Sequence, residues 1–379
     1  MALRRRTLHA PLLSQTPWAG PCARSWTFSG ARVSYWHSAR VALWQGVRRL
    51  GLEPGARVLV PGYCCGVEVA ALLDAGLEVD YYRVLPDLTP DLDHLEQLAR
   101  APARALFLIH YFGLPQPLEP LVAFARERGL RLIEDAAHGL FARQPDGAAL
   151  GSEADLAVFS LRKHLPVPDG GLLVLRGGEA GSAVRTRRPE LKRTAKTVGY
   201  LAAIELEHRW PRLNDDLRRL LRRPNGPRFA DVAGAAPADL VAAADPLGKE
   251  FDPGAVGTNA SWLSRTVYRW AGADEIRERR FRNFSTLQRA AQAAPGLRPL
   301  FTRLPDGASP WLFPVVAERA EDLRRFLWCN GVASIGFWRY VHPTIPRHLF
   351  PFEEGLRGRV VALPVHQGLS SDEIARIAR

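Results

Sequence analysis

Apolar and polar positions in the first half of the chain form alternating strand-like and helix-like blocks. Short apolar runs bounded by turn residues indicate buried strands, and between them apolar residues recur at helical spacing. This alternation with short connections favours an α/β fold, in which helices cover both faces of a mostly parallel sheet. The predicted strands cover 57–61, 78–84, 105–110, 130–134, 156–161 and 171–176, and the predicted helices cover 39–50, 67–75, 91–100 and 118–128.

The pattern changes in the second half of the chain. Residues 185–223 are rich in arginine and lysine, and helical periodicity over 202–222 indicates either a solvated amphipathic hairpin or an anion-binding surface. Residues 224–253 are rich in Pro, Gly, Ala and Asp and have the composition of a linker. The remainder predicts helices over 263–294, 320–330 and 371–379 and strands over 311–316 and 360–365.

These patterns divide the chain into three parts. Residues 1–30 lack periodicity and are expected to form a leader on the surface, residues 31–255 a large domain, and residues 256–379 a small α+β domain. A length of 379 residues is enough for two domains.

Composition narrows the class of protein. The chain is 47% hydrophobic and 24% charged, as in soluble globular proteins, and no apolar run is long enough to cross a membrane. A net charge of +12 suits an anionic ligand or simply reflects a bias toward arginine. No zinc spacing or nucleic-acid module is present. Four cysteines do not suggest a disulfide scaffold, so a reducing cytoplasm is expected. A signal peptide is not expected, because no apolar segment follows Arg4-Arg5-Arg6.

Two predicted strands end in polar residues that suit a binding site. Asp135 follows strand 130–134, and Lys163 lies three residues after Ser160. In parallel sheets, ligands bind outside the carboxyl ends of the strands, where His110 also falls. A lysine amine forms a Schiff base with pyridoxal phosphate, and a carboxylate keeps its pyridine nitrogen protonated. The alternatives are a solvated lysine and an aspartate that caps a helix.

The sequence also resembles the DegT/StrS (DegT/DnrJ) family of pyridoxal-phosphate aminotransferases, mainly over residues 35–176. This family has fold type I, like aspartate aminotransferase: a three-layer α/β/α large domain with a mostly parallel sheet, and a small α+β domain. The motifs that carry the resemblance are Ser38-Ala39-Arg40, Glu134-Asp135-Ala136-Ala137-His138, Phe159-Ser160 with Lys163 and Gly170-Gly171, and 362–367.

The resemblance implies a role for each matching residue. Lys163 would form the Schiff base with pyridoxal 5'-phosphate, and Asp135 would pair with the pyridine nitrogen. His138 would hydrogen-bond near the ring hydroxyl. Asn259 resembles a residue that reaches the phosphate of the neighbouring subunit, which implies a homodimer with shared active sites. The phosphate itself would be bound by Ser160 and by the helix start at Ser38, Ala39 and Arg40.

The expected activity is transfer of an amino group from an amino donor to a keto sugar or sugar nucleotide. The chain departs from the family pattern in three ways: the spacing from Ser160 to Lys163 is short, His164 follows the lysine, and Cys65 stands where the family has a ring-stacking aromatic. Some relatives that carry histidine catalyse a dehydration. A dehydratase or lyase on the same scaffold and a non-catalytic ligand-binding relative therefore remain alternatives. Neither a metal, nor nucleic acid, nor a membrane is expected as a partner.

Overall fold

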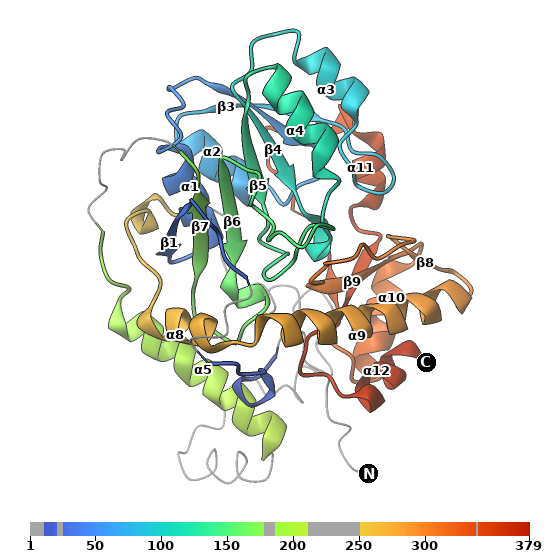
Figure 1. Ribbon diagram of the computed structural model, residues 1–379. Helices are drawn as coiled ribbons and strands as arrows, with labels where there is room; N and C mark the ends of the chain where they lie inside the picture. The colour runs from blue at the N-terminus through green and yellow to red at the C-terminus, as the bar shows by residue number, and fades with distance from the viewer. Residues whose placement is uncertain (1–10, 21–25, 178–185, 211–250, 339) are drawn as a thin grey trace.

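The computed structural model describes two units, each with helices packed around its own sheet (Figure 1). The predicted linker and most of the predicted helix over 202–222 lie outside the described residues. The helix α5 spans Leu191–Arg209, so it begins before the predicted start. The structure describes residues 11–20, 26–177, 186–210, 251–338 and 340–379.

A seven-stranded sheet forms the centre of the larger unit, in the order β1-β7-β6-β5-β4-β2-β3. Strands β2 to β6 run parallel to one another, and β7 is antiparallel to both of its neighbours. The predicted α/β class with a mostly parallel sheet is confirmed. The strands are β1 Arg32–Trp36, β2 Arg57–Pro61, β3 Glu78–Tyr82, β4 Ala105–Ile109, β5 Arg131–Asp135, β6 Leu156–Ser160 and β7 Gly171–Leu175.

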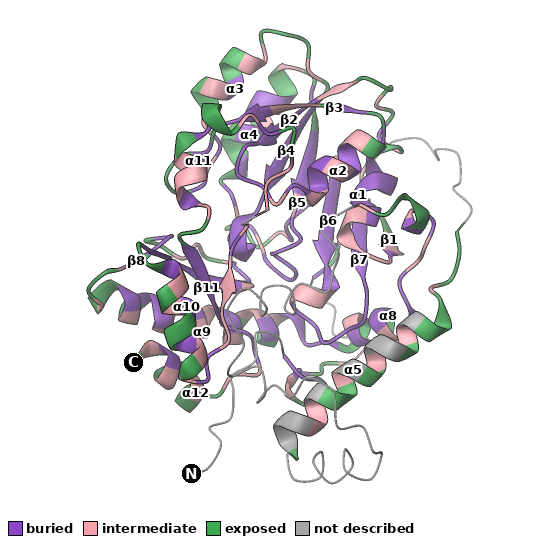
Figure 2. Ribbon diagram, turned by 180° about the vertical axis from the view of Figure 1, so that it is seen from behind, coloured by how far each residue is buried: buried purple, intermediate pink, exposed green. Residues whose placement is uncertain are grey.

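Helices cover both faces of this sheet. Helix α4 lies in front of the sheet in Figure 1, and α1 and α2 lie in front of it in the reverse view of Figure 2. Strands β4, β6 and β7 are therefore buried along their whole length, which explains their uninterrupted apolar sequences. The helices of this unit are α1 Ala39–Val47, α2 Val67–Asp74, α3 Leu92–Leu98 and α4 Leu118–Glu127.

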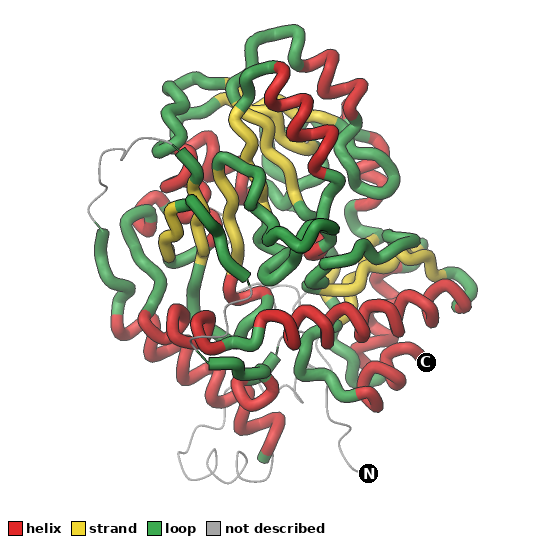
Figure 3. Tube along the Cα trace, viewed as in Figure 1, coloured by secondary structure: helices red, strands yellow, loops and turns green. Residues whose placement is uncertain are grey.

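The C-terminal unit contains a four-stranded antiparallel sheet in the order β10-β11-β9-β8, the second group of yellow strands in Figure 3. Helices α9, α10 and α12 pack on or beside it. The elements are α8 Trp262–Trp270, α9 Ala273–Ala293, β8 Leu297–Pro299, β9 Leu312–Ala317, α10 Ala320–Cys329, β10 Ile335–Gly336, α11 Pro351–Leu356, β11 Val360–Pro364 and α12 Ser371–Ala378.

The N-terminal segment corrects two expectations. A single helix over 263–294 was expected, but α8 and α9 are separate because residues 17–20 dock at the break, where Gly272 N–H donates to Pro17 O over 2.8 Å. Residues 1–30 were expected to lie on the surface, but Trp26 is 5% exposed and donates its indole N–H to Ala142 O. The described residues of this segment are therefore packed into the fold in part.

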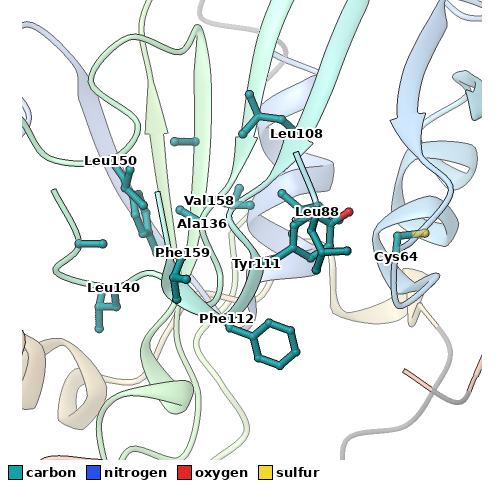
Figure 4. Close-up of a cluster of buried hydrophobic side chains, with 14 of the residues drawn as sticks. Cys64, Leu88, Leu108, Tyr111, Phe112, Ala136, Leu140, Leu150, Val158 and Phe159 are labelled. Carbon is teal, nitrogen blue, oxygen red and sulfur yellow. The ribbon is translucent and has the colours of Figure 1, made fainter. Parts of the chain in front are cut away.

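The core continues up to the strand ends where the polar motif residues lie. Figure 4 shows Phe159 and Val158 of β6 beside Ala136, which follows β5, with Tyr111 and Phe112 after β4. All five side chains are buried. A rigid apolar layer therefore supports the loops that follow β4, β5 and β6.

Candidate active site

Asp135 and Lys163 come from neighbouring parallel strands. Asp135 is the last residue of β5, and Ser160 ends β6, which is followed by a short 3-10 turn over Leu161–Lys163. The two strands pair in parallel, with Asp135 opposite Val158. Their carboxyl ends therefore lie at one edge of the sheet, which is the position that open α/β sheets use for ligands.

Asp135 is a half-buried carboxylate whose Oδ1 accepts a hydrogen bond from Ala137 N–H over 2.8 Å. Burial raises the pKa of Asp135 to about 6, and the Glu68 carboxylate adds to the increase, whereas Lys163 acts in the opposite direction. Such a carboxylate is a stronger proton acceptor than an exposed aspartate, so a cationic ring nitrogen would be a favourable partner.

Lys163 is half-buried, and burial lowers the pKa of its amine. Asp135, Cys65 and Glu68 oppose this effect, and Arg162 adds to it. The lowered pKa increases the fraction of neutral amine, which is the nucleophilic form. Its Nζ lies 4.6 Å from the centroid of the Trp311 ring. The structure therefore brings Lys163 and Asp135 into one charged cluster.

His138 lies beside this cluster as a buried, neutral ring. Its Nδ1 accepts the backbone N–H of Phe112 over 3.2 Å, so Nε2 carries the proton and is available as a donor. Burial and, secondarily, the Lys163 charge hold its pKa well below the usual range. Its ring lies 4.6 Å from that of Trp311. A neutral histidine in this position can donate to a hydroxyl or phenolate oxygen.

The start of α1 meets the end of β6 across Gly171. A Cβ at Gly171 would lie 2.1 Å from Ser38 O and 2.5 Å from Ala39 N, so only glycine fits. Gly171 pairs with Ser160 across the sheet. Ser38 is the N-cap of α1, with Oγ accepting from Val41 N–H, and Ala39 and Arg40 form the first turn. Predicted phosphate-binding residues are thus neighbours in space.

Asn259 lies at the edge of the same sheet. It forms an isolated antiparallel bridge with Trp36, and His37 N–H donates to Thr258 O over 2.9 Å. Asn259 is therefore beside the segment that leads into Ser38 within its own chain. Whether its side chain also serves a neighbouring subunit stays a prediction.

His110 is a structural residue beneath the site. Its Nδ1 accepts Gln116 N–H over 3.0 Å, and its Nε2 donates to Glu134 Oε2 over 2.9 Å. Glu134 also accepts Gly151 N–H over 2.8 Å. Because adjacent strand residues point to opposite faces, Glu134 supports the loops from within the core while Asp135 faces the site.

Residues that the sequence reading missed complete the site. Glu68, in the first turn of α2, is buried and accepts both the Cys65 N–H over 2.9 Å and the Cys65 thiol over 2.6 Å. Trp311 and Trp338 contribute rings from the C-terminal unit, and the Trp338 ring lies 5.7 Å from His138. The one feature of the sequence that pointed toward these residues was Cys65. It stands where an aromatic residue was expected, which implies that aromatic rings at the site come from other elements.

A further missed residue is Arg280 of α9, which is fully buried beneath the lysine turn. Its guanidinium donates to Gln367 Oε1 over 2.7 Å, to Pro310 O over 2.9 Å and to His164 O over 3.3 Å. Burial lowers its pKa to about 9. The C-terminal unit is therefore bonded directly to the residue after Lys163.

Comparison with known proteins agrees with this geometry. The model of the DegT/DnrJ/EryC1/StrS aminotransferase family matches residues 33–198. This part of the chain is therefore similar to that family. The match includes Asp135, His138, Ser160 and Lys163.

Individual relatives extend the comparison. The dTDP-4-dehydro-2,3,6-trideoxy-D-glucose 4-aminotransferase of Saccharopolyspora spinosa is 31% identical over 194 residues, which are 50% of this chain and 50% of that protein. The chain spans 30 to 50% of the length of the first curated relatives that it matches.

Solved structures resemble the whole described fold. A family member from Brucella abortus has a TM-score of 0.62 at 18% identity, covering 92% of this chain and 84% of that one. The aminotransferase TlmJ from Streptoalloteichus hindustanus has a TM-score of 0.61 at 21% identity, covering 91% and 83%. The expected fold, fold type I, is therefore confirmed.

Two kinds of feature are absent from the residues that the structure describes. None of their helices is long and apolar enough to cross a membrane. Within the same residues, no three or more His, Cys, Asp or Glu side chains are grouped to hold a metal ion.

Proposed function

We propose that this protein is a pyridoxal-phosphate-dependent aminotransferase that transfers an amino group to a keto sugar or keto-sugar nucleotide. The observation that carries the proposal is the placement of Asp135 at the end of β5 and of Lys163 in the turn after the neighbouring strand β6. Burial raises the pKa of the carboxylate and lowers that of the amine, and each charge acts on the other. Amine and carboxylate groups with perturbed pKa values at strand ends are typical of catalytic sites. The relatives named as sugar aminotransferases supply the substrate class.

The residues present fit this cofactor. The anionic phosphate suits the N–H groups at the start of α1, with Ser38, Ala39, Arg40 and Ser160 around them. Gly171 keeps this region free of a Cβ. Asp135 would pair with the pyridine nitrogen and His138 would donate to the ring hydroxyl. Lys163 would bind the aldehyde.

The chain's own residues then have distinct tasks. When bound, pyridoxal phosphate supplies a ring that accepts electrons from the substrate carbon next to nitrogen. Lys163, whose pKa burial lowers, would take a proton from that carbon as a neutral amine and, as the resulting ammonium group, deliver it to a second carbon. Asp135 would hold a proton at the ring nitrogen.

His164 gives no support to the dehydratase alternative. Its side chain is fully buried, and its Nε2 donates to Ser309 O over 3.1 Å. Burial holds the pKa of His164 well below its usual range. Lys163, and not the histidine after it, is therefore the group available to the site, which favours transfer over elimination. Exchange of amino groups with a donor, without loss of water from the substrate, is the expected reaction.

We further propose a cytoplasmic homodimer. The described cysteines Cys64, Cys65 and Cys329 are all free thiols, which suits a reducing compartment. Asn259 lies beside the segment leading to Ser38, so a two-fold axis near this edge would bring the corresponding residue of a second copy to the phosphate region.

Borohydride reduction of the holoprotein tests the proposed chemistry. The chain has only four lysines, Lys163, Lys192, Lys196 and Lys249, so a labelled peptide identifies its lysine without ambiguity. We expect the cofactor to be fixed to the Lys163 peptide and the label to be lost in Lys163→Arg. The matched control, Lys192→Arg at an exposed position of α5, should keep it. Labelling at another lysine, or at none, would overturn the proposal.

A further inference from the structure

Cys65 does not supply an aromatic contact to the site. Its thiol donates to Glu68 Oε2 over 2.6 Å, and its N–H donates to Glu68 Oε1 over 2.9 Å. The place where the family has an aromatic side chain is thus occupied by Cys65, which is hydrogen-bonded to Glu68 at the start of α2. If the site has an aromatic wall, the ring must come from a different element.

The ring of Trp311 lies close to the amine of Lys163. Lys163 Nζ lies 4.6 Å from the Trp311 ring centroid, within the range of cation–π contacts. Trp311 also neighbours His138, and the two ring centroids are 4.6 Å apart at an interplanar angle of 36°. Trp311 therefore contacts two of the residues that the motifs single out, although it lies just before β9 in the C-terminal unit.

The backbone holds Trp311 firmly in this position. Its N–H donates to Phe112 O over 2.7 Å, and Phe112 N–H donates to His138 Nδ1, so Phe112 bonds both the Trp311 backbone and the His138 ring. The carbonyl of Trp311 accepts from Arg280 over 3.3 Å. Its neighbour Ser309 accepts from His164 and donates to Gly113 O. Hydrogen bonds that hold the backbone of a site residue in this way are typical of preorganised sites.

We propose that Trp311 is a positioning residue of this site, whose ring face holds the Lys163 amine. The inference rests on the proposed function only in naming Lys163 as the reactive lysine. A ring face stabilises the ammonium form more than the neutral amine, because the negative face of the ring attracts a cation. Trp311 therefore opposes the effect of burial on the pKa of Lys163.

Several other charged or titratable groups also act on this amine. Asp135 at the end of β5, and Glu68 and Cys65 at α2, raise its pKa, whereas Arg162 on its own turn lowers it. His138 and His164 lie close enough to interact with the lysine charge as well. A test of Trp311 must leave all of these groups unchanged, so the ring should be altered electronically without a change of shape.

Fluorinated tryptophans at position 311 meet this requirement, because fluorine weakens the negative face and barely alters the size of the ring. The full-length, cofactor-free protein would carry ¹³C-labelled lysine, and the Lys163 resonance would be assigned with Lys163→Arg. We expect the pKa of Lys163 to fall stepwise with fluorine number, by roughly 0.5 pH unit for the most fluorinated ring. Tryptophan introduced by the same method is the reference.

Placement of the same analogues at Trp262 is the matched control. That side chain is 69% exposed on α8, and fluorination there should leave the Lys163 titration unchanged. A Lys163 pKa that stays constant across the series at position 311, or that moves equally in the control, would overturn the proposal. The readout needs no cofactor. Failure of borohydride labelling would therefore reject the proposed function without bearing on the contact between Trp311 and Lys163.

Discussion

Replacement of Asp135 by asparagine is expected to stabilise the cofactor-free protein at neutral pH. The pKa of Asp135 is about 6 in the folded chain, against an ordinary value of 3.8. A difference of about two pKa units corresponds to about 3 kcal/mol at 1.36 kcal/mol per unit. The folded state therefore loses up to about 3 kcal/mol when it must hold this carboxylate ionised, a sizeable part of an ordinary stability of about 5–15 kcal/mol.

The sign of the effect depends on pH. Below about pH 4, Asp135 is protonated in both the folded and the unfolded chain, so the wild type and Asp135→Asn should be equally stable. Between about pH 4 and pH 6, the unfolded chain loses this proton while the folded chain still holds it. The free energy of unfolding of the wild type therefore falls over this window, and the advantage of the variant reaches its full value above about pH 6.

Urea unfolding from pH 4 to pH 8, followed by tryptophan fluorescence, measures this difference directly. Asparagine keeps an oxygen that can accept the Ala137 N–H, so the local turn is preserved. Asp146→Asn is a matched control, because exposed Asp146 accepts the Ala148 N–H over 2.9 Å in the same kind of turn. We expect the control to change stability by less than about 0.5 kcal/mol at any pH. A difference for Asp135→Asn that is equal at pH 4 and pH 8, or a loss of stability at pH 8, would refute the reasoning.

Two other predictions concern the turn after β4 and the edge of the sheet. Gly113→Ala should destabilise the fold by roughly 2–5 kcal/mol in urea unfolding, because φ is +87° and a Cβ would lie 2.3 Å from His138 O and Ser309 O. Gly129→Ala, with φ of +62° and no atom within 4 Å, should cost only about 1 kcal/mol, and equal effects would contradict the steric argument. For Asn259, chains carrying Lys163→Ala and Asn259→Ala, each inactive alone, should regain part of the activity when mixed and reassembled. A fully active monomer would exclude shared sites.

The strand ends of the site could be predicted because their signal is local. An apolar run that stops at Asp135 or Ser160 marks a buried strand and its polar end within a few residues. Trp311 could not be assigned to the site in this way, because it precedes β9 and reads as the start of an ordinary strand. Its contact with Lys163 exists only because the C-terminal unit packs against the turn after β6.

Arg280 illustrates a second limit. It lies in a run of charged residues on α9, a pattern that normally indicates a solvated helix face. It is nevertheless fully buried, because backbone carbonyls and Gln367 Oε1 satisfy its guanidinium. The break between α8 and α9 has the same kind of cause. Gly272 alone is a weak signal, and the docking of Pro17 determines where the helices separate.

The hydrogen bonds of Arg280 also bear on how this chain can be divided. The carbonyl of His164, next to Lys163, accepts from Arg280 and, over 2.9 Å, from Gln367 Nε2. The stretch that matches the family model, residues 33–198, contains this carbonyl but neither of its donors. A chimera that joins this stretch to the C-terminal half of a protein from that family would therefore keep its lysine turn only if the incoming half brought an equivalent cation and amide. The conformation of the lysine turn is thus a property of both halves of the chain, and residues 33–198 alone do not carry it.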